Sequence, residues 1–345
     1  MAGSGPVPST PLLDAYAGVR PATQPVWFMR QAGRSLPEYR ASRAGTAMLD
    51  ACLTPDLAAE ITLQPVRRHG VDAAIFFSDI VVPLRLAGVD VEIVPGRGPV
   101  FARPVRDAAD LADLVAHELT DDALAPIEAA VAATVAQLGD VPLIGFAGAP
   151  FTLASYVVEG GPSKDQLRAR TMLHADPDAW RALTGYLARI SGAFLAAQVR
   201  GGARAVQLFD SWAGSLPEAD YRAAVLPASS AVLAAVQGVP KVHFGVGTAL
   251  LLPAMRDAGA DVVGVDHRLP LDEASALLGG GVPVQGNIDP ALLAAPWPVL
   301  RAHLEAVVDA GRAAPAHVLN LGHGVPPETD PGVLTRIVEW AHDLP

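Results

Sequence analysis

The sequence predicts an α/β protein folded as a single (β/α)8 TIM barrel, and three observations support this fold class. Eight short apolar runs of strand length recur along the chain, separated by longer Ala/Leu-rich segments of helical period. The runs are continuously apolar, as in parallel strands that are covered on both faces. A weak repeat also ends three of the runs with an aspartate, at Asp79, Asp210 and Asp266. Eight strands favour the closed barrel over the open doubly wound sheet, and no G-x-G-x-x-G motif follows the first run.

The expected strands alternate with helical segments in a regular order. They are PVWFM (25–29), DAAIFF (72–77), VPLIGFA (141–147), AVQLF (205–209), KVHFGV (241–246), DVVGV (261–265), VPVQGN (282–287) and HVLNLG (317–322). Between the first two runs, Thr54-Pro55-Asp56 predicts a helix start with Thr54 as the N-cap, and Gly70 predicts the end of that helix. The segment 80–105 does not fit a simple βα unit, so we expect an extra hairpin near these residues.

The domain organisation expected is one catalytic domain over residues 11–345, preceded by a flexible N-terminal tail over residues 1–10. No Ser/Gly-rich linker divides the chain. The N-terminal MAGSGPVPSTP lacks the basic and apolar regions of a signal peptide.

Composition excludes several classes of function. The formal net charge is -11 and no run of Lys and Arg occurs, which argues against nucleic-acid binding. No apolar stretch reaches the roughly 18–20 residues of a membrane span. The single cysteine, Cys52, excludes an internal disulfide framework, and we therefore expect a cytoplasmic protein. An anionic ligand would have to be attracted by a local basic pocket.

Such a pocket is indicated by two arginines that follow the first run, in PVWFMRQAGRSLPEYR. Arg30 and Arg34 are four residues apart, in either a helix or, because of Gly33, a loop. Guanidinium groups bind carboxylates in a bidentate manner, so the pair fits a carboxylate site. The alternative is two solvated surface arginines. Arg43 would add a third cation, or is a solvated helix residue.

Other polar residues are expected at the same end of the barrel. A carboxylate at Asp79 is unfavourable to bury unless it is paired or used, although it could serve as an N-cap. Tyr156 fits either a site or an amphipathic core position. Ser211 lacks a G-x-S-x-G elbow, so a capping role is the alternative to a nucleophile. For Asp210 and Asp266, the structural alternative is that each carboxylate caps a helix or forms a salt bridge at the barrel rim.

Histidines raise the question of a metal site. His243, His267 and His323 follow separate runs, without H-x-H or H-E-x-x-H spacing, so we predict no metal. His323 differs from the others because glycines flank it on both sides. Close approach of the backbone to a ligand, or turn geometry, would explain those glycines.

Five segments together resemble the uroporphyrinogen decarboxylase family. They are VWFMRQAGR, GFAGAPFTLASYVVEGG, QLFDSWAG, QGNIDP and NLGHGVPPETDP, and the similarity runs from about Pro11 to Pro331. The resemblance implies a single-domain barrel, a homodimer with facing active-site clefts, and no cofactor or metal. It also implies a small-molecule substrate, a cyclic tetrapyrrole with four acetate and four propionate groups, which loses the acetate carboxyls as CO2.

Site residues are implied position by position. Arg30 and Arg34 match arginines that hold substrate carboxylates, and Arg43 falls on a third arginine position. Asp79 matches the aspartate at the centre of the substrate, where it would stabilise a cationic intermediate through the pyrrole N–H groups. The remaining substrate-binding positions implied by the resemblance are Gln31, Ala32, Gly33, Tyr156, Ser211 and His323. Two departures are Ser35, where the family most often has tyrosine, and Trp212, where histidine is also common.

Two other functions remain open at this point. Cobamide-dependent methyltransferases share the barrel superfamily but hold zinc with His and Cys, whereas the only cysteine here, Cys52, precedes the first capped helix. A non-catalytic tetrapyrrole carrier would bind the same substrate without releasing CO2.

Overall fold

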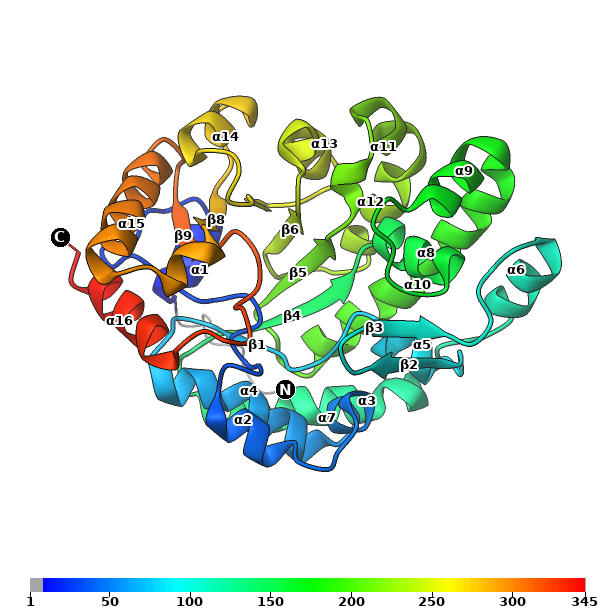
Figure 1. The fold of residues 1–345 in the computed structure, drawn as a ribbon, viewed down its shortest axis with the longest axis horizontal. Coiled ribbons are helices and arrows are strands. Elements are labelled where there is room, and N and C mark those ends of the chain that lie inside the picture. Colours follow the sequence, from blue (N-terminus) through cyan, green and yellow to red (C-terminus); the bar gives the residue numbers. More distant parts are fainter. Residues whose placement is uncertain (1–8, 345) are drawn as a thin grey trace, which may run out of the picture.

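A computed structural model describes residues 9–344, and its centre is a curled sheet of parallel strands surrounded by helices (Figure 1). Seven strands pair in parallel in the order β1-β4-β5-β6-β7-β8-β9. Their bounds are β1 (Ala74–Ile75), β4 (Leu143–Gly148), β5 (Ala205–Asp210), β6 (Lys241–Gly245), β7 (Val262–Gly264), β8 (Val284–Ile288) and β9 (His317–Leu321). The predicted α/β barrel architecture is confirmed, with one difference at the first strand.

The first predicted strand, 25–29, is wrong as a full strand because only Val26 pairs, in an isolated parallel bridge with Leu319 of β9. Trp27 N donates to Leu319 O at 3.2 Å, and on the other side Asp72 N donates to Val26 O at 2.9 Å. Beyond Trp27 the backbone N–H groups bond to side chains instead of to a neighbouring strand, as Met29 N does to Asn320 Oδ1 at 3.0 Å. The segment 25–29, called the closing segment below, therefore fills the position between β9 and β1 without forming a ladder.

Eight helices follow the closing segment and the seven strands and cover the outside of the sheet (Figure 1). They are α4 (Pro55–His69), α7 (Asp121–Leu138), α10 (Pro177–Arg200), α12 (Leu226–Ala234), α13 (Leu252–Asp257), α14 (Leu271–Leu277), α15 (Trp297–Gly311) and α16 (Pro331–His342). This regular alternation agrees with the prediction from apolar runs and helical segments.

The start and end of α4 are those predicted. It begins at Pro55 after Thr54, and Gly70 ends it with φ of 67°, in the left-handed region that favours glycine. The role of the Thr54 side chain differs, since its hydroxyl donates to Asp50 O at 2.8 Å and makes no cap bond to α4. The Thr54 hydroxyl thus bonds to a carbonyl of the preceding short helix, α3 (Met48–Cys52), instead of to a backbone N–H of α4.

Shorter elements lie in the connections. The expected extra hairpin is confirmed: β2 (Val91–Val94) pairs antiparallel with β3 (Gly98–Phe101), and both lie beside α5 at one side of the barrel (Figure 1). The other helices are α1 (Pro11–Tyr16), α2 (Pro37–Ser42), α5 (Val82–Leu86), α6 (Ala108–Val115), α8 (Pro150–Glu159), α9 (Leu167–Ala175) and α11 (Glu218–Ala224), with 3-10 turns η1 (Ala213–Ser215), η2 (Ala249–Leu251) and η3 (Pro290–Ala294).

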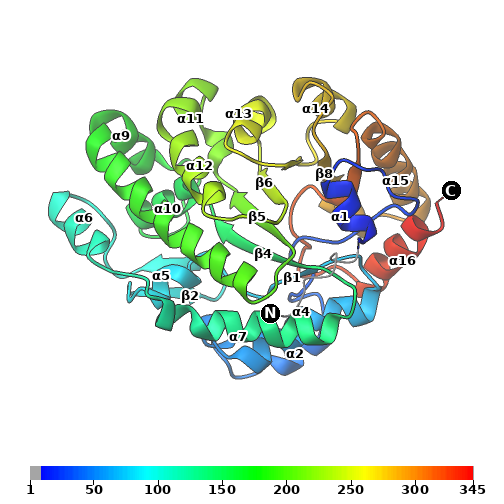
Figure 2. The same ribbon diagram turned by 180° about the vertical axis from the view of Figure 1, so that it is seen from behind.

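A buried polar network joins α1 to the barrel interior, and Figure 2 shows α1 in front of the strands when the molecule is seen from behind. Gln285 Oε1 accepts from Tyr16 Oη at 2.5 Å and from Trp27 Nε1 at 3.1 Å. Its Nε2 donates to Gln207 Oε1 at 2.9 Å. One amide thus connects α1, the closing segment, β5 and β8, which positions the closing segment without a strand ladder.

No helix within residues 9–344 is long and apolar enough to cross a membrane. Most of the tail expected over residues 1–10 falls outside the described residues.

We expect replacement of Gln285 by Met to destabilise the fold by about 3 kcal/mol, because Tyr16, Trp27 and Gln207 each lose a buried hydrogen-bond partner. Denaturant unfolding measures this difference. Gln237→Met is the matched control, since Gln237 is exposed and should change stability by no more than about 0.5 kcal/mol. Equal stability of the two variants would contradict the proposed importance of the network.

Candidate active site

The polar residues singled out in the sequence lie at the C-terminal ends of the strands, the face on which barrel enzymes carry their reactive groups and which we call the barrel mouth. Their places in the chain are Arg30 and Arg34 after the closing segment, Asp79 after β1, Tyr156 on α8 after β4, Ser211 after β5, and His323 after β9.

The segment from Arg30 to Arg34 forms a turn, which decides between the helix and the loop left open by the sequence. Arg30 has φ of 62°, a left-handed conformation that costs on the order of 1–3 kcal/mol for a residue other than glycine. The buried side chain of Gln31 holds the turn, accepting from Phe28 N at 3.0 Å and donating to Ala73 O at 2.9 Å. A Cβ at Gly33 would lie 2.8 Å from Arg30 O, so glycine permits the tight turn. Arg30 and Arg34 both remain exposed.

The glycines on either side of His323 make room for other parts of this chain. A Cβ at Gly324 would lie 2.7 Å from Arg30 Cγ and 3.0 Å from Arg30 Nε. A Cβ at Gly322 would lie 2.7 Å from His267 Cβ and would overlap the backbone nitrogen of that residue. The His323 turn is therefore packed between Arg30 on one side and His267 on the other.

His323 is a neutral hydrogen-bond donor in this setting. Loss of water on the side of the ring packed against the turn lowers its pKa, and the charges of Arg30, His267 and Arg268 lower it further. Its Nδ1 accepts from Gly324 N at 2.7 Å, which leaves the proton of the neutral ring on Nε2. Because His323 is exposed, this Nε2–H can donate to an anionic group at the barrel mouth.

Asp79 is a half-buried carboxylate near the arginine turn. Burial raises its pKa, whereas the hydrogen bond from Val81 N, at 3.1 Å, and the nearby charge of Arg30 lower it. Tyr156 feels both charges: burial and then Asp79 raise the pKa of the phenol to about 12, and Arg30 opposes them. Arg30, Asp79 and Tyr156 thus come together from three separate strand ends.

Arg34 and Arg43 lie around a buried tyrosine beside this cluster. The Arg43 guanidinium carbon is 5.6 Å from the centre of the Tyr39 ring. The pKa of Tyr39 is raised by burial, and the charges of Arg43 and Arg34 lower it. Arg43 is half-buried at the end of α2, which favours the third-cation interpretation over a fully solvated helix residue.

An aromatic stack joins the turn after β5 to α8. The Tyr156 and Trp212 rings are 4.0 Å apart between centroids and inclined by 28°. Ser211, which precedes Trp212, is half-buried. The position that departs from the common family residue therefore contributes directly to the wall of the site.

The residue that sequence reasoning missed is Thr152, near the start of α8. Its hydroxyl donates to Asp210 Oδ1 at 2.8 Å and accepts from Trp212 N at 3.3 Å, so it fixes α8 against the turn after β5. Asp210 is fully buried, and burial raises its pKa to about 7. Asp210 thus bonds to the Thr152 hydroxyl, whereas α8 itself has no side-chain cap at Ala149. A hydroxyl residue in the first turn of a helix that follows a strand, in APFT, was the available signal.

Within residues 9–344, no three or more His, Cys, Asp or Glu side chains form a group able to hold a metal ion. His243 is fully buried and faces Met255 O, and His317 Nε2 lies 2.6 Å from Gly286 O. Cys52 is buried, which raises the pKa of its thiol.

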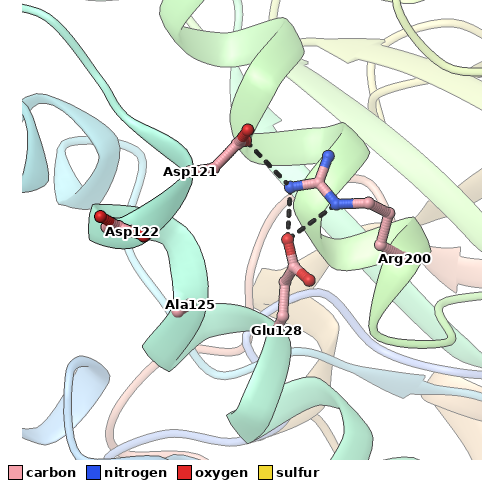
Figure 3. A pocket seen from close by; sticks show the side chains of 5 residues that line it. All are labelled: Asp121, Asp122, Ala125, Glu128 and Arg200. Carbon is pink, nitrogen blue, oxygen red and sulfur yellow. Dashed lines mark hydrogen bonds and ion pairs between the residues drawn. The ribbon is translucent and has the colours of Figure 1, made fainter.

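A hollow of about 360 Å³ on the outer surface does not belong to the site (Figure 3). It lies between α7 and α10, and its arginine, Arg200, is already paired with Glu128 and, at 3.6 Å, with Asp121. None of its lining residues comes from a strand end.

Fold and site together define a barrel enzyme whose mouth brings a half-buried carboxylate, Asp79, close to Arg30. Among solved structures, a methyltransferase from Methanosarcina mazei is similar in fold, with a TM-score of 0.77 at 18% identity over 96% of this chain and 97% of that one. A B12-independent methionine synthase from Shewanella sp. W3-18-1 is a more distant match, with a TM-score of 0.54 at 11% identity over 83% of this chain and 87% of that one.

Sequence comparison is more specific. The family model described as "Uroporphyrinogen decarboxylase (URO-D)" matches residues 8–344. The uroporphyrinogen decarboxylase of Arthrobacter sp. (strain FB24) is 66% identical over 342 residues, covering 99% of each chain. That of Leifsonia xyli subsp. xyli (strain CTCB07) is 62% identical, covering 96% of this chain and 93% of the relative. This chain belongs to the uroporphyrinogen decarboxylase family, which confirms the resemblance seen in its sequence.

The buried Asp210 predicts a specific pH dependence of stability. Its folded pKa of about 7 exceeds the unfolded value of about 3.9, so its contribution is fully present below pH 4 and is lost as the pH rises through 7. Three units correspond to roughly 4 kcal/mol. The free energy of unfolding of the wild type minus that of Asp210→Asn should fall by about this amount between pH 4 and pH 8.

Taking this difference cancels the contribution of the buried histidines to the pH dependence of stability, because that contribution is common to both proteins. His243, for example, has a lowered pKa of about 4, which changes stability with pH in the opposite direction. Denaturant unfolding at a series of pH values measures the difference. A pH-independent difference would show that Asp210 is ionised throughout.

Proposed function

We propose that this chain decarboxylates uroporphyrinogen III to coproporphyrinogen III by removing its four acetate carboxyls as CO2, in porphyrin and haem biosynthesis. The observation that carries the proposal is the half-buried Asp79, placed with Arg30 and Tyr156 at the mouth of the barrel. The relatives that are 56–66% identical over almost the whole chain carry the name of this activity.

Substrate binding is assigned to the cations at the barrel mouth. Arg30 and Arg34 are exposed on a turn fixed by Gln31, and Arg43 lies with Arg34 around Tyr39. These three guanidiniums would bind carboxylates of the substrate. Gln31 uses its side chain to hold this turn, whereas Ala32 and Gly33 shape its surface. The Nε2–H of His323 adds a neutral donor for an acetate or propionate.

The reaction needs an electron sink, and the substrate itself provides one. Protonation of a pyrrole carbon makes that ring an iminium-like cation. The bond between the acetate methylene and its carboxylate then breaks, CO2 leaves, and the bonding electrons neutralise the cation. A second proton converts the remaining methylene into a methyl group, and loss of the first proton from the ring carbon restores the neutral aromatic pyrrole. No cofactor is needed for this sequence.

Asp79 is assigned the stabilisation of the cationic ring. Pyrrole N–H groups pointing at the carboxylate favour its ionised form, against the effect of burial. At about 4 Å and an effective dielectric constant near 20, such a charge contact contributes up to about 4 kcal/mol. Preorganised charge of this kind is usually the largest catalytic term. Tyr156, whose phenol stays protonated, and Ser211 would position the macrocycle.

We also propose a homodimer with facing clefts, a cytoplasmic location and a single catalytic domain over residues 11–345. The family resemblance supports the dimer, the single buried cysteine fits a reducing compartment, and the strands within residues 9–344 form one barrel sheet with a small hairpin beside it.

The function is tested by incubating the protein without oxygen with the octacarboxylate substrate, then oxidising the products and counting their carboxyls by chromatography. A tetracarboxylate product supports the proposal, and unchanged octacarboxylate bound to the protein supports the carrier. Stoichiometric zinc together with thiol methylation would instead favour the methyltransferase.

Asp79→Asn keeps the shape of the side chain and removes its charge, so we expect kcat to fall about a thousandfold while affinity for an oxidised octacarboxylate porphyrin changes little. Steady-state kinetics and fluorescence quenching measure the two quantities. Asp113→Asn, at an exposed carboxylate on α6, is the control and should match the wild type. Near-normal turnover of Asp79→Asn would refute the assigned role.

Gly324→Ala tests the position of Arg30, because the new Cβ would occupy the space of the Arg30 side chain. We expect affinity for the octacarboxylate porphyrin to fall about tenfold, the contribution of one displaced charge-assisted contact. Gly185→Ala in α10 is the matched control, since nothing lies within 4 Å of a Cβ built there. Unchanged affinity of Gly324→Ala would mean that Arg30 can bind from another conformation.

A further inference from the structure

The cations assigned to the substrate all come from one side of the barrel. Arg30, Arg34 and Arg43 follow the closing segment, which lies between β9 and β1. A tetrapyrrole with eight carboxylates carries them around its whole perimeter, so cations on a single side leave the opposite carboxylates without partners. The other walls of the barrel are therefore the place to look for a further anion-binding residue.

One such wall is formed by β7, which is three positions from the closing segment, counted through β9 and β8, in a barrel of eight positions. Figure 1 shows α13 and α14, which flank β7 in the chain, across the barrel from α4 and α7, which flank β1. Two residues after β7 comes the buried Asp266, and two further on comes Arg268, whose side chain is 54% exposed.

Asp266 holds Arg268 in place. Its Oδ2 accepts from Gly247 N at 2.6 Å and from Arg268 Nη1, and its Oδ1 accepts from Arg268 N at 3.1 Å. The same loop is held from below by Asn287, which donates to Asp266 O at 2.8 Å and to Leu269 O at 2.6 Å. Both oxygens of the carboxylate are thus occupied by this chain, and its 3% exposed side chain is not open to a ligand.

The Arg268 guanidinium, unlike the Asp266 carboxylate, is open to a ligand. Only Nη1 has a partner within residues 9–344, which leaves the N–H groups on Nε and Nη2 for a ligand. Since the partner carboxylate is buried and the guanidinium is exposed, the pair presents a cation to the barrel mouth although its net charge is zero. An arginine oriented by a buried carboxylate also loses little conformational freedom on binding.

Arg268 belongs to the same mouth as the known candidates. Its charge lowers the pKa of His323, as that of Arg30 does. The His323 turn is packed between the Arg30 side chain at Gly324 and His267 at Gly322, and Arg268 directly follows His267. The series of cations and donors therefore continues from Arg30 through His323 to the loop after β7.

We propose that Arg268, oriented by Asp266, binds a carboxylate of the substrate other than those held by Arg30 and Arg34. The ligand class is a propionate or acetate side chain of a polycarboxylate tetrapyrrole, so the inference rests on the proposed function. The competing interpretation is a rim ion pair that only fixes the loop after β7.

The test measures the affinity for oxidised octacarboxylate porphyrin by fluorescence quenching. Binding of this porphyrin does not require turnover. Arg268→Gln should weaken binding by about tenfold to a hundredfold, the range for a charge-assisted hydrogen bond. The effect should shrink in high salt. Arg103→Gln is the matched control: its side chain is 83% exposed and pairs with Asp113, so its affinity should equal that of the wild type.

Arg268→Lys separates ligand binding from loop support. Lysine keeps a cation beside Asp266 but cannot offer a planar fork, so melting temperature should stay near that of the wild type while porphyrin affinity falls at least fivefold. Wild-type affinity in Arg268→Lys at normal melting temperature, or in a folded Arg268→Gln, overturns the inference and leaves the ion pair a purely structural role.

Failure of the proposed function is distinguishable from failure of this inference. Wild-type protein that releases no CO2 refutes the decarboxylase, yet the porphyrin-binding comparison still decides whether Arg268 contributes. Wild-type protein that releases CO2, with variants that bind normally, refutes the role of Arg268 alone.

Discussion

The backbone of Val26 and Trp27 is hydrogen-bonded to Leu319 on one side and to Asp72 on the other, and this contact closes the barrel. The contact is short, so its geometry depends on side chains: Trp27 on the Gln285 amide, and Met29 on Asn320. The arginine turn begins immediately after Met29. The position of the arginines proposed to bind carboxylates, relative to the His323 turn, thus follows from how the two ends of the barrel meet.

An acidic protein binds a polyanion only if its cations are local and its own carboxylates are kept from them. Here exposed arginines surround the barrel mouth, whereas the aspartates that follow strands β5 and β7 are buried. Neutral donors extend the site without adding charge, since partial loss of water and neighbouring cations keep His323 unprotonated and burial keeps Tyr156 protonated. The formal charge of -11 is therefore compatible with an anion site.

Features set by local sequence were predictable, and those set by distant contacts were not. The apolar runs predict the sheet order, and proline and glycine predict the ends of α4, because these depend on neighbouring residues. The turn at Arg30 depends on Gln31 reaching Ala73, and the glycines around His323 depend on Arg30 and His267. Sequence resemblance identifies the positions of candidate residues, whereas their orientation comes only from the fold.

The weak repeat placed three aspartates in similar sequence positions, and packing gives each a different role. Asp210 is fully buried against Thr152, and both oxygens of Asp266 are occupied by Gly247 and Arg268. Asp79 is half-buried, and its carboxylate accepts from Val81 N at 3.1 Å. Asp210 Oδ2 lacks a hydrogen-bond partner within residues 9–344, but it is closed off inside the fold, whereas Asp79 is partly exposed. Burial and hydrogen bonding together therefore distinguish these equivalent-looking residues: a carboxylate enclosed by its own chain orients its neighbours, and one left partly exposed is available to a ligand.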